Sequence, residues 1–266
     1  IVGDAMAVPL LDALDANPER WDLSYVFSVG SGGAVLSTSK QEAFKAYFPN
    51  VFITNSFGSS ESGKMGMDGG GKKGPGLGNV TKSEFMSVIS DVEGEPHRHV
   101  AVGEMGLFAR SGYIPVAYYN NPVKTATTIV EGEGQEWLLL VDAGGFEEDN
   151  SITVFGRGSN CLNPGGEKVF PEEVEQALKA HPDIFDCLVV ATPDERFGSK
   201  VTAVVSARGG AALTLLSVHE EARKHLAGYK VPRELHVVEE VPRAPSGKPA
   251  YPKALEIALA GEHRVS

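Results

Sequence analysis

Two short apolar runs, each followed by a turn rich in glycine and serine, constrain the fold of this chain most strongly. The first run, Tyr25–Val29, leads into Gly30–Ala34. The second run, Val51–Thr54, leads into Asn55–Glu61, and residues 37–48 between the runs have the apolar spacing of a helix. Strands that alternate with a helix indicate a parallel βαβ unit, and such sheets bind ligands at the carboxyl ends of their strands. Both turns are therefore candidate parts of a ligand site.

The rest of the chain predicts a β-rich part followed by a separate α+β domain. Four strand-like runs separated by turns favour a small antiparallel sheet or barrel: residues 86–89, 106–109, 137–141 and 152–155. Beyond a polar stretch, a helix that starts at Pro171 and further β-rich runs favour a compact α+β domain. We therefore expect an α/β plus α+β chain, with the end of a large domain at 1–156, a hinge at 157–160 and a small carboxyl-terminal domain at 161–266.

Capping residues and composition give further local predictions. Asp4 is placed to cap a helix that ends near Asn17, and Ser217 with Glu220 is a possible capping box for a later helix. Residues 63–78 contain many glycines and few apolar side chains, so we expect a surface loop there.

Two phosphate-binding patterns fall inside this glycine loop. Gly69–Gly74 matches the dinucleotide-binding pattern, and Gly66–Lys73 nearly matches the phosphate-loop pattern. Neither follows a predicted strand or opens a helix, so the helix N-terminus that binds anions is missing. A surface loop is therefore favoured over a phosphate cradle.

The charge balance and the cysteine content exclude several classes of protein. The chain has 24 lysine and arginine residues against 35 aspartate and glutamate residues, for a formal charge of −11. That acidic excess argues against a nucleic-acid partner and against broad attraction to an anionic membrane. Only Cys161 and Cys187 are present, which disfavours a disulfide framework or a cysteine-rich zinc site and predicts a reducing, cytoplasmic location. No apolar run approaches the ~20 residues of a membrane span.

Phe57–Glu61 is the first candidate for ligand chemistry. The segment offers an aromatic ring, a flexible glycine, two hydroxyls and a carboxylate at a predicted strand end. Such a set can stack on a base, hydrogen-bond a phosphate and hold Mg²⁺, a cation that prefers one carboxylate plus substrate oxygens. When the segment is taken alone, an exposed polar turn is the more common outcome.

Asp142 and Arg157 each follow an apolar strand-like run. A carboxylate accepts hydrogen bonds from both hydroxyls of a ribose, and a guanidinium donates to the sugar or to a phosphate. The pair therefore suits a nucleotide sugar, and a surface ion pair is the ordinary alternative.

Lys248 and the pair Gly165–Gly166 are the candidates in the carboxyl-terminal part. Pro242 and Pro245 frame the turn that presents Lys248, and a held ammonium is a good partner for a developing anion. The glycine pair allows a backbone to approach a ligand closely. The simpler alternatives are a solvated lysine and a loop that leads into the helix at Pro171.

The order of the motifs along the chain is more specific than any one of them. They are Ser31–Ala34, Phe57–Glu61, Gly103–Gly106, Tyr118–Pro122, Asp142, Gly156–Arg157, Gly165–Glu167 and Ser246–Lys248. In this order they resemble the carboxyl-terminal half of an adenylate-forming acyl-CoA synthetase (ANL superfamily) of the fatty-acyl-CoA ligase type. The resemblance covers essentially the whole chain. Residues 165–175 are most similar in character to actinobacterial ligases for fatty acids or sterol side chains.

The resemblance implies a two-step reaction that uses ATP, Mg²⁺ and CoA. A small carboxylic acid attacks the α-phosphorus of ATP to form an acyl-adenylate, and the thiol of CoA then displaces AMP. Between the steps the small domain is expected to rotate about the hinge and bring Gly165 and Gly166 to a pantetheine tunnel.

The resemblance also implies which residues bind the nucleotide base. By the resemblance, Gly32, Gly33 and Ala34 would line the adenine and acyl pocket. The ring of Phe57, next to Gly58, would stack on adenine.

The remaining implied roles concern the phosphates, the ribose and catalysis. Ser60 would meet the α-phosphate, and Glu61 would bind Mg²⁺. Asp142 and Arg157 would hold the ribose. Lys248 would bridge the acyl carboxylate and the phosphate, where it stabilises charge that grows during adenylation.

The chain departs from the family's pattern at three points. Phe57 replaces a usual tyrosine and keeps the ring without the hydroxyl, and Ser159 stands where the hinge usually has aspartate or lysine. The Ser/Thr/Gly-rich loop that wraps the β- and γ-phosphates would lie before Ile1. We therefore expect a truncated portion of an enzyme that does not adenylate alone.

Two alternatives stay open. The first is an adenylating enzyme that loads a carrier-protein pantetheine, which is disfavoured because the sequence ends soon after Lys248. The second is a non-catalytic nucleotide- or acyl-binding module, which would suit a chain without the phosphate loop. The sequence predicts neither the acyl chain length nor the oligomeric state.

Overall fold

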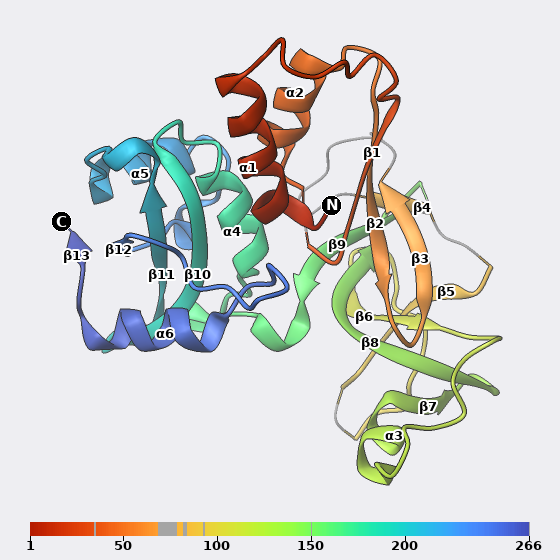
Figure 1. The fold of residues 1–266 in the computed structure, drawn as a ribbon. Coiled ribbons are helices and arrows are strands. Elements are labelled where there is room, and N and C mark those ends of the chain that lie inside the picture. Colours follow the sequence, from red (N-terminus) through yellow and green to blue (C-terminus); the bar gives the residue numbers. More distant parts are fainter. Residues whose placement is uncertain (35, 69–78, 82–83, 93, 150, 266) are drawn as a thin grey trace. The chain divides into compact units, whose positions relative to one another are not determined.

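The computed structural model describes residues 1–34, 36–68, 79–81, 84–92, 94–149 and 151–265 (Figure 1). The two phosphate-binding patterns of the glycine loop extend into 69–78, and that part lies outside the described residues.

A three-stranded sheet contains the predicted βαβ strands. Strands β1 (Ser28–Gly32) and β2 (Phe52–Ser59) pair in parallel, and β3 (Gly63–Asp68) pairs antiparallel with β2 (Figure 1). The parallel pairing is confirmed. The prediction of a loop over residues 63–68 was wrong, because their backbone extends the sheet and Met65 is buried in the core. Glycines weaken the apolar signal of a strand without preventing backbone pairing.

A second sheet of six antiparallel strands has the order β4-β9-β8-β6-β5, with β7 paired to β8. Its strands are β4 (Asn79–Thr81), β5 (Met86–Ile89), β6 (Met105–Arg110), β7 (Ile129–Gly132), β8 (Gln135–Phe146) and β9 (Ser151–Arg157). The short helix α3 (Pro122–Thr128) precedes β7. Phe108 is fully buried in this sheet's core, and its ring lies so close to Gly144 that a side chain there would collide with it. The expected small antiparallel sheet is therefore confirmed.

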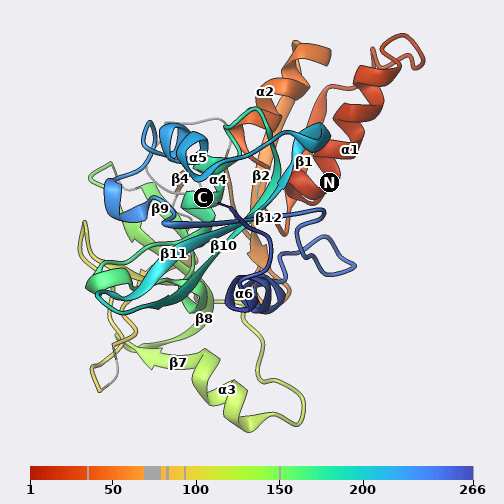
Figure 2. The ribbon, with the colours of Figure 1, turned by 90° about the vertical axis from the view of Figure 1, so that its left-hand side faces the viewer.

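The carboxyl-terminal part forms a four-stranded sheet with the order β10-β11-β12-β13, and β10, β11 and β12 are labelled in Figure 2. Its strands are β10 (Ile184–Asp194), β11 (Gly198–Ala207), β12 (Glu234–Val238) and β13 (Arg264–Val265). Its helices are α4 (Pro171–Leu178), α5 (Leu215–Ala222) and α6 (Tyr251–Ala260). The 3-10 helices are η1 (Gly158–Asn160), η2 (Pro164–Gly166), η3 (Arg208–Gly210) and η4 (Gly228–Lys230).

Both faces of this sheet are buried. On β10, Cys187 and Val189 pack in the cluster that contains α4 and α5 residues, whereas Leu188 and Val190 pack in the cluster that contains α6 residues. Successive side chains of a strand point to opposite faces, so a strand that is covered twice has a continuous apolar sequence. This explains the unbroken run Cys187–Ala191.

Two predicted helix caps were wrong. Helix α1 (Gly3–Ala16) begins before Asp4, so the carboxylate of Asp4 is not the N-cap and instead accepts from the backbone N–H of Ser37. Helix α5 begins at Leu215, and Thr214 with Ser217 forms its capping box. Ser217 is therefore the third helical residue rather than the cap.

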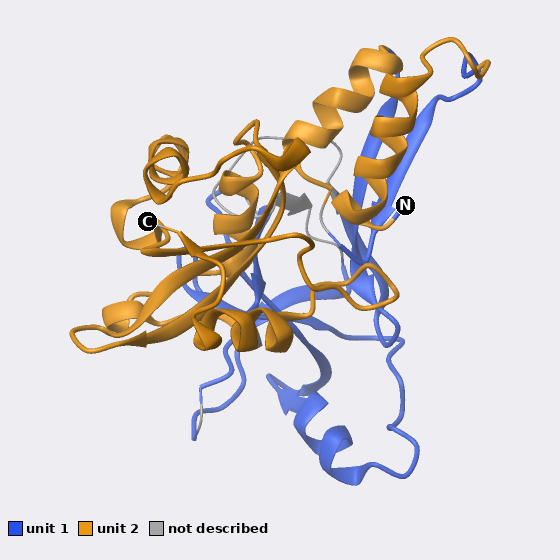
Figure 3. Cartoon of the chain, turned by 60° about the vertical axis from the view of Figure 1, so that its left-hand side comes forward, with its two compact units in different colours: residues 1, 23–35, 50–159 blue, residues 2–22, 36–49, 160–266 orange. Residues whose placement is uncertain are grey.

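The chain divides into two compact units (Figure 3). Unit 1 contains residues 1, 23–35 and 50–159, and unit 2 contains residues 2–22, 36–49 and 160–266. Helices α1 and α2 (Thr38–Tyr47) thus group with the carboxyl-terminal part, although the sequence assigned them to 1–156. The division of the enzyme at a hinge over 157–160 stays a prediction. Within the part of the chain that the structure describes, no helix has the length and apolar character needed to cross a membrane.

Candidate functional site

In unit 1, the register of β1 against β2 brings the two predicted turn motifs together. Gly32 pairs with Ser56, the residue before Phe57. The hydroxyl of Ser31 donates to the carbonyl of Ala34, 3.2 Å away, and Gly33 has a φ of +77°. The turn at Gly32–Ala34 therefore lies beside the start of the Phe57–Glu61 motif.

The Phe57–Glu61 motif begins inside β2 and continues into the turn before β3, because β2 extends to Ser59. The half-buried ring of Phe57 packs on Phe108, with 4.5 Å between ring centroids. Gly58 has a φ of +154°, and a side chain there would collide with the carbonyl oxygen of Gly63. Ser60 is exposed. The hairpin thus fixes an aromatic ring next to a backbone position that only glycine can occupy.

Glu61 lies at the turn of this hairpin and is partnered from α3 and the loop before it. The hydroxyl of Tyr118 donates to Oε1 of Glu61 at 2.8 Å, and Nζ of Lys124 lies 3.8 Å from the same oxygen. The Lys124 ammonium also lies 3.9 Å from the ring centroid of Tyr118. The Tyr118 hydrogen bond is the main cause that lowers the pKa of Glu61. Glu61 is therefore an ionised carboxylate whose side chain is 32% exposed.

This donor set is compatible with Mg²⁺ that is bound together with a phosphate. Mg²⁺ usually keeps several waters and binds one or two carboxylates plus substrate phosphates. Glu61 supplies one ionised carboxylate next to the exposed hydroxyl of Ser60. Among the described residues, no group of three or more His, Cys, Asp or Glu side chains could hold a metal.

Asp142 on β8 and Arg157 on β9 are direct cross-strand partners. Directly opposite residues of an antiparallel pair place their side chains on the same face. Burial raises the pKa of Asp142, and the positive charge of Arg157 opposes that shift. The pair therefore combines a partly buried carboxylate with an exposed arginine at one place on the sheet.

Gly165 and Gly166 lie in η2 of unit 2 and have φ values of +63° and +90°. The N–H of Gly165 donates to the carbonyl of Phe197 at 3.0 Å. Both glycines are exposed. A hydrogen bond thus holds this loop to Phe197, in the turn between β10 and β11. The backbone of Gly165 and Gly166 stays accessible to a ligand.

Lys248, also in unit 2, extends from a tight hairpin. Arg243 and Pro249 form a β-bridge, and the N–H of Ala244 donates to the carbonyl of Lys248 at 2.9 Å. Gly247 has a φ of +79°, which closes the turn. The side chain of Lys248 is exposed. An ordered backbone therefore presents an exposed lysine side chain.

Sequence reasoning assigned no role to Tyr118 or Lys124. Tyr118 belongs to a motif that was recognised, but 57 residues separate it from Glu61, and no local pattern predicts their hydrogen bond. Lys124 faces Glu61 because Asn121 caps α3 by accepting from the N–H of Lys124. The Asn121–Pro122 dipeptide is the signal that could have placed this helix start.

Comparison with known sequences identifies relatives along almost the whole chain. A family described as the AMP-binding enzyme C-terminal domain matches residues 173–248. A 3-oxocholest-4-en-26-oate–CoA ligase from Rhodococcus rhodochrous is 45% identical over 94% of this chain and 46% of the relative. A medium/long-chain-fatty-acid–CoA/3-oxocholest-4-en-26-oate–CoA ligase from Mycolicibacterium smegmatis is 44% identical over 96% of this chain and 47% of the relative. The chain thus spans about half the length of the curated relatives it matches.

Solved structures share the fold. The anthranilate CoA ligase AuaEII in complex with anthranoyl-AMP aligns with a TM-score of 0.78 at 22% identity, over 97% of this chain and 54% of that one. Apo MatB from Rhodopseudomonas palustris aligns with a TM-score of 0.65 at 25% identity, over 87% of this chain and 45% of that one. The predicted fold class, α/β plus α+β, is confirmed.

Replacing Tyr118 by phenylalanine removes the hydroxyl that donates to Glu61 and is expected to raise the pKa of Glu61. Because the folded-state pKa is lowered, the hydrogen bond stabilises the fold above the unfolded-state pKa, and this stability is lost as the pH falls through the folded-state pKa. We expect Tyr118→Phe to reduce the free energy of unfolding by about 1 kcal/mol at neutral pH, because the site is partly exposed. The effect should vanish in strong acid. NMR titration of the Glu61 carboxyl and urea unfolding measure both quantities.

Tyr119→Phe is the matched control, because the side chain of Tyr119 is 94% exposed. It should leave the pKa of Glu61 and the unfolding free energy unchanged. An unchanged pKa of Glu61 in Tyr118→Phe would contradict the assigned hydrogen bond.

Proposed function

Because the chain belongs to the adenylate-forming superfamily and is similar to its actinobacterial acyl-CoA ligases, we propose that it is part of an ATP- and Mg²⁺-dependent acyl-CoA ligase. In the first step a carboxylate oxygen of the acid bonds to the α-phosphorus of ATP, and pyrophosphate leaves. In the second step the sulfur of CoA bonds to the acyl carbon, and AMP leaves. The thiol proton passes to solvent or to a basic group.

One observation carries this proposal. An ionised, partly exposed carboxylate, Glu61, lies on the same hairpin as the ring of Phe57, and the register of β1 places Gly32 beside that hairpin. Phe57 would stack on adenine, and Gly32–Ala34 with Gly58 would allow the base and the acyl group to approach the backbone. Ser60 would donate to the α-phosphate. Glu61 would hold Mg²⁺, which neutralises phosphate charge when bound.

Asp142 and Arg157 would hold the ribose. The carboxylate of Asp142 accepts hydrogen bonds, and the guanidinium of Arg157 only donates them, so together they suit hydroxyls that do both. Burial of Asp142 strengthens such bonds, because charge-assisted hydrogen bonds gain from reduced contact with water.

Lys248 would act in the adenylation step. Negative charge grows on the oxygens of the α-phosphorus as the carboxylate attacks and pyrophosphate departs. An ammonium fixed near those oxygens stabilises the transition state more than the bound substrates. The ordered hairpin and the exposure of Lys248 support this role.

Gly165 and Gly166 would serve the second step, where their exposed backbone would border the pantetheine of CoA. This requires residues 161–266 to rotate about 157–160, so that one active site serves both steps in turn. The acyl substrate is proposed to be a fatty acid or a sterol side-chain acid, from the names of the relatives.

Lys248→Ala in the full-length enzyme should separate the two steps. We expect ATP–pyrophosphate exchange to fall by about 100-fold or more, because a preorganised cation that stabilises growing charge is lost. Formation of acyl-CoA from preformed acyl-adenylate should change by less than about threefold, because Lys248 does not act in that step. Lys253→Ala removes a nearby exposed lysine on α6 and should affect neither step. Equal loss of both steps in Lys248→Ala would contradict the proposed role.

Asp142→Ala in the full-length enzyme should weaken ATP binding by more than about 1 kcal/mol, or roughly fivefold, as expected for a lost charge-assisted hydrogen bond. Isothermal titration calorimetry measures this. Glu136→Ala, which removes an exposed carboxylate from the same strand, is the control. ATP affinity equal to that of the unsubstituted enzyme would refute the assignment of Asp142.

A further inference from the structure

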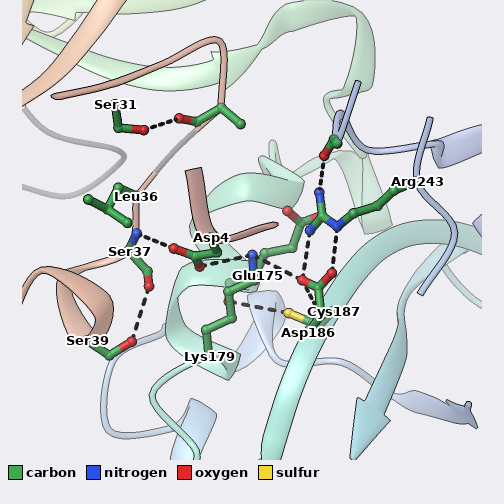
Figure 4. A network of polar contacts seen from close by, with 12 residues as sticks. Asp4, Ser31, Leu36, Ser37, Ser39, Glu175, Lys179, Asp186, Cys187 and Arg243 are labelled. Carbon is green, nitrogen blue, oxygen red and sulfur yellow. Dashed lines mark hydrogen bonds and ion pairs between the residues drawn. The ribbon is translucent and has the colours of Figure 1, made fainter. Parts of the chain in front are cut away.

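Four side chains of alternating charge form a series of ion pairs (Figure 4), and the last of them, Arg243, belongs to the hairpin that presents Lys248. They are Asp4, Lys179, Asp186 and Arg243, and their exposed fractions are 6%, 12%, 14% and 16%. All four belong to unit 2. None of them has a role in the proposed reaction, although keeping charged groups this far from water is costly unless they are paired.

Arg243 connects the hairpin to β10 through three hydrogen bonds. Its Nε and Nη2 atoms donate to the two carboxylate oxygens of Asp186, at 2.6 and 2.7 Å. Its Nη1 atom donates to the carbonyl of Gly247 at 2.9 Å. Gly247 is bonded directly to Lys248, so one guanidinium fixes the backbone of Lys248 relative to the sheet. Such a planar fork loses less rotational freedom per hydrogen bond than a lysine would.

Lys179 supports Asp186 from the other side. Its ammonium lies 3.4 Å from Oδ1 of Asp186 and 3.3 Å from Oδ2 of Asp4. Oδ1 of Asp4 accepts from the N–H of Ser37 at 2.8 Å, at the start of α2. Burial acts to raise the pKa of Asp186, but the Arg243 hydrogen bonds and the charge of Lys179 outweigh it and lower that pKa. Asp186 is therefore an anion with two cationic partners.

The side chain of Lys248 is exposed. A lysine side chain has a flexible four-carbon stem, so the position of its ammonium depends on where its backbone is held. A catalytic group that is displaced by about 1 Å can lose on the order of 100-fold in rate. The backbone of the hairpin must therefore be fixed for Lys248 to act.

We propose that Arg243 and Asp186 are positioning residues that hold the Lys248 hairpin in the geometry needed for adenylation, with Lys179 holding Asp186 and, before residues 161–266 rotate for the second step, Asp4 holding Lys179. This rests on the proposed function of Lys248. A purely structural ion pair would stabilise unit 2 without preference for either step. Loss of a positioning pair would instead make the hairpin less ordered and would slow the adenylation step.

The test compares Arg243→Gln with Lys230→Gln in the full-length enzyme. Lys230 pairs with Glu173, and both side chains are 18% exposed. Within the described residues, no side-chain hydrogen bond or ion pair joins this pair to the hairpin. Each substitution thus removes one cation from a partly buried ion pair of unit 2. The readouts are ATP–pyrophosphate exchange, acyl-CoA formation from preformed acyl-adenylate, and hydrogen exchange of peptides that cover 243–249.

We expect Arg243→Gln to reduce the turnover of ATP–pyrophosphate exchange by about 10- to 100-fold, with the KM for ATP and the second step changed by less than about threefold. Hydrogen exchange over 243–249 should become faster. Lys230→Gln should change neither step by more than about threefold. Arg243→Lys keeps the charge without the fork, and its exchange activity should lie between those of Arg243→Gln and the unsubstituted enzyme.

Asp4→Asn is a milder second variant, because an asparagine oxygen can still accept from Ser37 while the charge that faces Lys179 is lost. It should also speed hydrogen exchange over 243–249, by less than Arg243→Gln does. Asp4→Asn replaces Arg243→Gln in the hydrogen-exchange test if Arg243→Gln does not fold.

Three results would overturn the proposal. They are unchanged hydrogen exchange of the hairpin in Arg243→Gln (or in Asp4→Asn if that variant is used), equal loss of both steps in Arg243→Gln, and the same selective loss in Lys230→Gln. Failure of the proposed role of Lys248 is distinguishable, because it would appear as normal adenylation in Lys248→Ala. The hydrogen-exchange measurement would still decide whether Arg243 holds the hairpin.

Discussion

The parallel register between β1 and β2 is the constraint on which the candidate nucleotide site depends. It places Gly32 opposite Ser56, so the glycine turn after β1 lies beside Phe57. A slip of one residue would turn the side chains of the pair to the opposite faces of the sheet. The next hairpin depends on the register between β2 and β3, because Gly58 must accept the close backbone of Gly63 for Glu61 to lie at the turn. Tyr118 and Lys124 then fix the carboxylate from another part of unit 1.

In unit 2 the corresponding constraint is that a charged side chain must be paired when it lies in a sheet that is buried on both faces. An unpaired carboxylate at Asp186 would be strongly destabilising, and the structure supplies Arg243 and Lys179 as partners. The same guanidinium that compensates Asp186 also holds the carbonyl before Lys248. Stability of the small sheet and placement of the proposed catalytic lysine are therefore linked through one side chain.

The sequence predicted the elements whose signals are local, and it missed contacts between distant residues. The apolar runs around Val51–Thr54 and Cys187–Ala191 predicted strands, because burial of alternating or continuous apolar side chains leaves a readable pattern. Asp4 resembled a helix cap, yet its partners are Ser37 and Lys179, which lie 33 and 175 residues away. The site roles came from the order of motifs, and no local pattern could supply long-range partners such as Tyr118 or Arg243.

The central claim is that the enzyme forms an acyl-adenylate, and oxygen transfer tests it most directly. The full-length protein would be incubated with ATP, Mg²⁺, CoA and a fatty acid whose carboxyl oxygens are ¹⁸O, and the products analysed by mass spectrometry. The attacking carboxylate oxygen stays on phosphorus when CoA displaces AMP, so the account predicts one ¹⁸O in each AMP and none in pyrophosphate. Formation of ADP with ¹⁸O in inorganic phosphate, or acyl-CoA with unlabelled AMP, would contradict it.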